Sequence, residues 1–193
     1  MPTEPDGCVQ IGTANVVDAG TPDHPLPVVL LGGGLRAVIM VNAHGENLCR
    51  WLPLARSLVL TGLRVVLYDP RAGTAAELAQ VAGWLRDRGN AEVAYLGAGS
   101  GAAVALTAAK TTSPPPYAVV ALTPTTVPGR PAPIRLLVVA ASGDRAGAET
   151  ARQLVVVGRG TLRLVPGSGR GAALVTGPAA APLVAELAGY LHR

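Results

Sequence analysis

The stretch of sequence that decides the fold runs from Ala91 to Leu106 and consists of AEVAYLGAGSGAAVAL. Its first part is apolar and short, as in a buried strand, and its last part is small and apolar, as in a buried helix. Gly97, Gly99 and Gly101 lie between the two parts. Because glycine permits sharp turns and close backbone contacts, this pattern predicts a strand that turns directly into a helix.

Three interpretations of this turn compete. Gly97, Gly99 and Ala102 fit the dinucleotide-binding pattern G-x-G-x-x-[GA], but the next expected strand, 117–122, does not end in the acidic residue that this pattern requires. The spacing also fits G-x-S-x-G, in which a serine sits at a strained corner between strand and helix. Here Gly99 takes the serine's place, and Ser100 comes one residue, or about 100° of helix rotation, too late. In the third interpretation the glycines serve only tight packing.

The rest of the chain alternates between short apolar runs and segments with helical periodicity. We expect strands at 28–31, 37–41, 63–68, 91–96, 117–122, 134–140 and 161–165, and helices at 46–61, 74–88, 100–110, 146–155 and 178–191. Gly32-Gly33-Gly34 between the first two strands predicts a hairpin turn. The pattern indicates one α/β domain over residues 1–193, with a mostly parallel sheet, helices on both faces and an antiparallel start. Residues 1–25 are expected to be a partly irregular lead-in.

Composition and charge exclude several classes of protein. The net charge is +4, but the arginines are scattered and aromatic residues make up only 3%, which argues against nucleic-acid binding. The sequence contains no run of about 18 apolar residues, so it predicts no membrane span. The N-terminus lacks the pattern of a signal peptide. Cys8 and Cys49 leave a single disulfide open but do not indicate a disulfide framework. We therefore expect a soluble, cytoplasmic protein, without cofactor or metal, from a GC-rich bacterial genome.

From Arg36 to Arg193 the chain resembles the α/β-hydrolase superfamily, especially its small lidless esterase and dienelactone-hydrolase-like members. The matching segments are WLPLAR at 51–56, RVVLYDPR at 64–71, LLVVAASGD at 136–144 and LVPGSGRG at 164–171. The second is similar to the family's Y-D-x-R-G turn, in which Asp69 and Arg71 are expected to stabilise the turn. The third and fourth are similar to the segments that carry the acid and the histidine of a catalytic triad, in the family's chain order.

The chain departs from this family at the two positions that matter most for hydrolysis. Gly99 stands where the resemblance implies the serine, and Arg170 stands where it implies the histidine, while Asp144 keeps the position of the acid. Glycine supplies no nucleophile, and an arginine side chain, which stays protonated, cannot accept a proton near neutral pH. Conventional serine hydrolase activity is therefore not expected.

Backbone donors do not depend on side chains and would survive these changes. The resemblance implies an oxyanion pocket formed by the amide of Ser100 and that of a residue near Ala43, and a helix N-terminus favours an anion. Arg170 would add a charge and several donors. The predicted ligand-binding residues are Ala43, His44, Gly99, Ser100 and Arg170. The sequence thus predicts an altered hydrolase-fold protein that binds a small acyl or carboxylate-type ligand or catalyses a non-hydrolytic step such as cyclisation or isomerisation.

Two alternatives remain at this stage. The first is an esterase or thioesterase that uses Ser100 with His44 and Asp144 as an unconventional catalytic set. The second is a non-catalytic interaction subunit, as a homodimer or as a dimer with a homologue, because a missing lid leaves one face uncovered. Arg170 also has a purely structural interpretation, an ion pair with Asp144.

Overall fold

The computed structural model describes residues 15–68 and 74–193. Eight strands of this part form one sheet in the order β1-β2-β4-β3-β5-β6-β7-β8. The strands are β1 (Asn15–Asp18), β2 (Pro27–Leu31), β3 (Arg36–Val41), β4 (Arg64–Tyr68), β5 (Glu92–Ala98), β6 (Ala118–Leu122), β7 (Arg135–Ala141) and β8 (Thr161–Val165). Strand β2 pairs antiparallel with both β1 and β4, whereas β3 to β8 run parallel to one another. This arrangement confirms the predicted architecture. Asp69 and Arg71, with their expected turn, lie outside the described residues.

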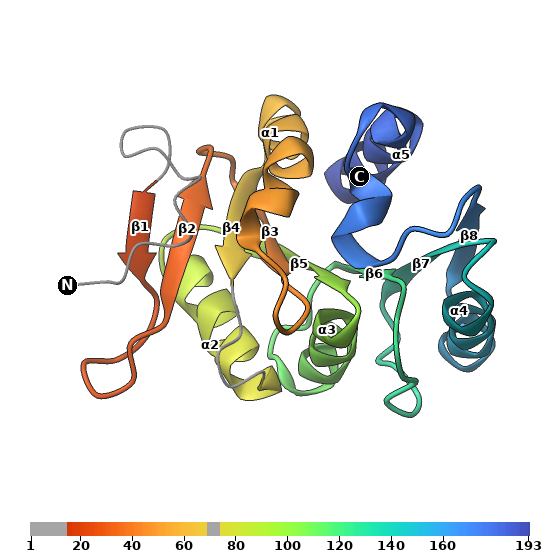
Figure 1. The fold of residues 1–193 in the computed structure, drawn as a ribbon. Coiled ribbons are helices and arrows are strands. Elements are labelled where there is room, and N and C mark those ends of the chain that lie inside the picture. Colours follow the sequence, from red (N-terminus) through yellow and green to blue (C-terminus); the bar gives the residue numbers. More distant parts are fainter. Residues whose placement is uncertain (1–14, 69–73) are drawn as a thin grey trace.

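Helices cover both faces of the sheet. Figure 1 shows α1 and α5 on one face and α2, α3 and α4 on the other. The helices are α1 (Leu52–Leu60), α2 (Ala75–Arg86), α3 (Ser100–Thr111), α4 (Arg145–Gly158) and α5 (Ala181–His192), joined by the short 3₁₀ helices η1 (Leu48–Trp51), η2 (Gly171–Val175) and η3 (Pro178–Ala180). Within β5, Val93 and Tyr95 pack toward α2, α3 and α4, whereas Ala94 and Leu96 pack toward α1 and α5. Because successive residues alternate between two buried faces, the strands are apolar throughout.

The predicted hairpin at Gly32-Gly33-Gly34 is wrong. Strand β2 pairs with β4, and β4 lies between β2 and β3, so the two strands next to the glycines are not neighbours. A Cβ atom on Gly34 would collide with the carbonyl oxygen of Gly62, at the end of α1. The glycines therefore let the connection between β2 and β3 pass close to the backbone at Gly62. Local sequence does not distinguish this role from a turn.

Helix boundaries differ modestly from the predicted ones. The segment expected as one helix over 46–61 begins with η1 and continues as α1, with Pro53 in the first turn where its missing N–H is harmless. Helix α4 runs to Gly158, beyond the expected end at 155. Residues 178–191 divide into η3 and α5. The helix η2, directly after Arg170, had no counterpart among the predicted elements. In the described part of the chain, no helix is long and apolar enough to cross a membrane.

The C-terminal turn of α5 is held by side chains, three of which come from distant parts of the chain. The last four carbonyls of a helix have no partner within the helix. Here each accepts a hydrogen bond from a side chain: Gly189 from Arg193 (3.1 Å), Tyr190 from Arg135 (3.2 Å), Leu191 from Tyr117 (2.6 Å) and His192 from Arg36 (2.5 Å). Three of the four donors are arginines, whose positive charge also suits the negative end of the helix dipole. This set of donors, the α5 clamp, ties the helix to the amino-terminal ends of β3, β6 and β7.

The Tyr117 hydroxyl makes the α5 clamp sensitive to alkaline pH. Burial raises the pKa of Tyr117 to about 12, and the nearby charge of Arg36 opposes part of this shift. Since the pKa is near 10 in the unfolded chain, the stabilisation from this group is complete below pH 10 and is lost as pH rises toward 12. We expect Tyr117→Phe to lower the free energy of unfolding by about 1 kcal/mol at pH 8, because one hydrogen bond is lost.

The difference between wild type and Tyr117→Phe should then shrink as pH rises through 10 and 11. Urea unfolding followed by circular dichroism at each pH would measure it, and other tyrosines titrate in both proteins and so cancel. A difference that stayed constant from pH 8 to pH 11 would contradict this account.

Candidate functional site

The candidate site lies at the edge of the sheet where the parallel strands end, which is where α/β folds generally bind ligands. Five strands supply it with residues. The loop 42–47 follows β3, Gly99 follows β5, Thr123 follows β6, Asp144 follows β7 and Arg170 lies in the loop after β8. Backbone hydrogen bonds continue past the strand ends, from Gly99 N–H to the Leu122 carbonyl (2.9 Å) and from Thr123 N–H to the Val139 carbonyl (2.7 Å). The positions of these residues are therefore fixed by the sheet.

Gly99 is the strained residue of the turn between β5 and α3. Its φ of 54° and ψ of −119° define a backbone conformation that residues with a side chain rarely adopt. In a G-x-S-x-G turn this is the corner that presents the serine. A Cβ atom on Gly99 would lie 3.2 Å from the Cβ of Ala43. A small side chain would thus fit with a shift of a few tenths of an ångström, so lack of space does not by itself require glycine here.

The two outer glycines of the turn are required by packing. A Cβ atom on Gly97 would collide with the carbonyl oxygen of Gly101, and one on Gly101 would collide with the carbonyl oxygens of Val41 and Asn42. The turn, the first residues of α3 and the end of β3 therefore meet backbone to backbone. Both the packing interpretation and the G-x-S-x-G interpretation of the sequence are compatible with this contact.

Ser100 and His44 lie next to each other, but the imidazole is not involved. Ser100 is the first residue of α3, and its Oγ accepts a hydrogen bond of 2.9 Å from the backbone N–H of His44. Both residues are exposed. Among the described residues, no hydrogen bond joins the His44 ring to Ser100 or to Asp144. The structure thus brings two members of the alternative Ser100–His44–Asp144 set together without the proton-transfer contact that such a set uses.

Asp144 and Arg170 form an ion pair. The Arg170 Nη2 donates to Asp144 Oδ1 at 2.5 Å, and the same oxygen accepts from the Gly147 N–H (3.3 Å) at the start of α4. The Asp144 side chain is 2% exposed and that of Arg170 is 68% exposed. One guanidinium donor is therefore bound to a buried carboxylate, while most of the Arg170 side chain faces solvent. Both the ion-pair and the ligand-contact interpretations of Arg170 are compatible with this geometry.

Asn42, Glu46 and Thr123 are parts of the site that the sequence analysis did not identify. Asn42 is fully buried directly after β3, where it accepts from Trp51 Nε1 (3.0 Å) and donates to the Glu46 carbonyl. Thr123 Oγ1 accepts from the Gly171 N–H (3.2 Å) and so anchors the loop beside Arg170. For Asn42 and Thr123 the available signal was a polar residue immediately after an apolar strand, since that position lies at the carboxyl edge of the sheet.

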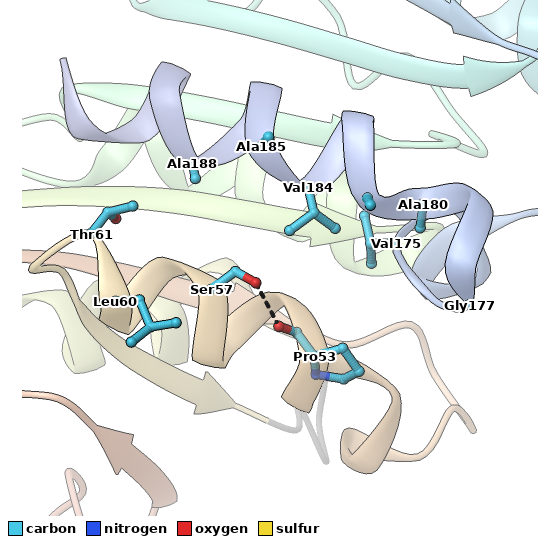
Figure 2. A pocket seen from close by; sticks show the side chains of 11 residues that line it. Pro53, Ser57, Leu60, Thr61, Val175, Gly177, Ala180, Val184, Ala185 and Ala188 are labelled. Carbon is cyan, nitrogen blue, oxygen red and sulfur yellow. Dashed lines mark hydrogen bonds between the residues drawn. The ribbon is translucent and has the colours of Figure 1, made fainter.

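Two other features of the structure bear on the location of the site. A groove of about 440 Å³ lies between α1 and α5, lined by residues such as Pro53, Leu60 and Val184 (Figure 2). None of the predicted ligand-binding residues lines it. Cys49, on η1, is disulfide-bonded and so does not offer a free thiol. Within residues 15–68 and 74–193, no cluster of three or more histidine, cysteine, aspartate or glutamate side chains could hold a metal ion.

Comparisons with known proteins agree with this fold. No family model and no curated protein matches the sequence. Among solved structures, a dienelactone hydrolase from Anabaena variabilis is 18% identical with a TM-score of 0.75, over 92% of this chain and 95% of that one. The esterase domain of a Rhodothermus marinus protein is 17% identical with a TM-score of 0.79, over 93% and 98%. A lidless α/β serine hydrolase from Xanthomonas campestris is 18% identical with a TM-score of 0.69, over 94% and 93%.

The chain therefore has the α/β-hydrolase fold. Its described part is similar in structure to lidless, esterase-like proteins of that fold, as the ordered sequence matches predicted. Because the identities lie below 20%, the comparisons establish the fold only. The activity depends on the residues of the site and not on the fold.

Proposed function

We propose that this protein uses the α/β-hydrolase fold to bind a small carboxylate or acyl-type ligand without cleaving it by serine attack. The observation that carries the proposal is the conformation of Gly99. The strained corner that would present a nucleophile holds a residue with no side chain. Arg170, which takes the sequence position of the histidine, is paired with the buried Asp144.

The chemistry of these two residues argues against ester hydrolysis. Serine attack needs an oxygen nucleophile and a neutral base that accepts its proton. Gly99 has no side-chain oxygen that could attack an ester. The guanidinium of Arg170 is permanently protonated and so cannot accept a proton. Where nucleophile and base have been removed from other hydrolases, the rate fell by about a million-fold. The same loss would leave this site with binding and electrostatic functions.

Those remaining functions suit an anionic oxygen. The N–H groups of Ser100 and Gly101, at the start of α3, have no partners within the helix, and the helix dipole favours negative charge at this end. The exposed guanidinium of Arg170 adds forked donors that match a carboxylate. Such a site could also stabilise an enolate-like oxygen, which is what a cyclisation or an isomerisation would need from it. The ligand-binding set predicted from the sequence remains the proposed one: Ala43, His44, Gly99, Ser100 and Arg170.

Isothermal titration calorimetry with short carboxylic acids tests the proposal. We expect wild type to bind at least one of them, and Arg170→Ala to weaken binding about tenfold because a charge-assisted contact is lost. Arg163→Ala is the matched control, since Arg163 is an exposed arginine paired with Glu186 at 2.9 Å on the outer strand β8. No binding by wild type, or equal binding by Arg170→Ala, would overturn the proposal.

The position of Gly99 can be tested by restoring the missing groups. We expect the double variant Gly99→Ser with Arg170→His to hydrolyse p-nitrophenyl acetate about 10²-fold faster than wild type, the lower end of what a positioned general base contributes. Each single variant should stay near the wild-type rate, because nucleophile and base act as a unit. Adding Ser100→Ala should leave the gain unchanged. A folded double variant with no gain would show that Gly99 is not at the nucleophile position.

The contact between Ser100 and His44 supports one alternative function, an esterase or thioesterase that uses Ser100 with His44 and Asp144. A fluorophosphonate probe separates the two functions because it labels an activated serine. We expect no labelling of wild type above the level of a heat-denatured sample. Labelling that disappears in Ser100→Ala would favour the alternative and overturn the proposal.

A further inference from the structure

A second carboxylate, that of Glu46, lies beside the loop that carries Arg170. A Cβ atom on Gly171 would lie 3.0 Å from Glu46 Oε1 and 3.5 Å from Glu46 Oε2, and 3.6 Å from the Cβ of Ala98. Ala98 precedes Gly99, and Gly171 follows Arg170. The Glu46 carboxylate therefore lies against Gly171, which is itself close to Ala98.

The backbone of Glu46 is fixed by hydrogen bonds at both its N–H and its carbonyl. Its N–H donates to the Ala43 carbonyl (3.0 Å), and its own carbonyl accepts from the buried Asn42 side chain. Asn42 is itself held by Trp51 Nε1. These contacts fix the starting point of the Glu46 side chain, and among the described residues no salt bridge to the carboxylate is found.

The carboxylate has an unmet hydrogen-bonding capacity. Glu46 Oε2 is buried, and no donor among the described residues reaches it. A buried acceptor without a donor is unfavourable, and more so when it carries charge. Gly171, with a φ of 54° and no side chain, places no Cβ atom against Glu46 Oε1 on the side toward the loop of Arg170.

We propose that Glu46 is a specificity-determining residue of this site, which accepts a hydrogen bond from a hydroxyl or ammonium group of the bound carboxylate. The inference rests on the proposed function, because it assumes that an anionic group binds near Arg170. A simple carboxylate is attracted by Arg170 and repelled by Glu46. A ligand that carries a donor as well as a carboxylate satisfies both side chains. The preferred ligands are therefore hydroxy- or amino-carboxylic acids.

Three probes with the same carbon skeleton test this selectivity by calorimetry: propionate, lactate and alanine, the last two as separate enantiomers. We expect wild type to bind lactate or alanine about tenfold more tightly than propionate, since only these offer a donor. Tighter binding of lactate identifies a hydroxyl as the donor, and tighter binding of alanine identifies an ammonium group. Arg170→Ala should weaken binding of every probe that binds.

Glu46→Ala should reduce the preference to threefold or less while the affinity for propionate stays equal or rises, because repulsion is removed with the acceptor. Glu46→Gln, which keeps the size but not the charge, should lose the preference for alanine and guards against a folding defect in the alanine variant. Glu149→Ala is the matched control, because Glu149 is an exposed glutamate on α4 that pairs with Arg152.

The outcomes separate this inference from the proposed function. Binding of propionate as tight as that of lactate and alanine would overturn the role of Glu46 and leave the carboxylate site standing. A preference that survives in both folded Glu46 variants would do the same. Absence of binding by all three probes would overturn both proposals.

Discussion

Three stretches of backbone meet at the turn between β5 and α3 so closely that no side chain fits between them. The carbonyl oxygens at the end of β3 lie against Gly101, and the Gly101 carbonyl lies against Gly97. This steric constraint fixes how α3 leaves the sheet and how near the loop after β3 comes to Gly99. The remaining parts of the site are arranged around it, because Thr123, Asp144 and Arg170 follow neighbouring parallel strands whose register is set by the same sheet.

The constraint acts on the backbone, whereas hydrolysis depends on side chains. The side chains needed for hydrolysis can therefore change while the backbone contact stays the same. The corner conformation of Gly99 is one that costs a residue with a Cβ atom on the order of 1–3 kcal/mol and costs glycine much less. Exchanging a serine for glycine at such a corner removes a nucleophile and relieves strain in the same step. A fold of this kind can thus lose its reaction and gain stability, the usual direction of the trade between the two.

Much of the fold could be predicted because its signals are local. Apolar runs such as 136–140 are buried on both faces, and the glycine pattern from Gly97 to Gly101 marks the turn. The hairpin at Gly32 failed because strand pairing is not local: β4 enters between β2 and β3 from further along the chain. Glu46 was missed for a similar reason, since its environment is made by Ala98 and Gly171, which are distant in sequence. The ion pair between Asp144 and Arg170 could be predicted because the order of family-like segments placed the two residues together.

The α5 clamp has a consequence for how the chain opens. A helix at the end of a chain usually frays, because its last carbonyls are bound only by water. In α5 those carbonyls are bound by Arg36, Tyr117 and Arg135, which belong to or adjoin strands in the interior of the sheet. The final turn cannot detach without freeing these side chains from the sheet edge. We therefore expect the final turn of α5 to open together with the amino-terminal ends of β3, β6 and β7 rather than on its own.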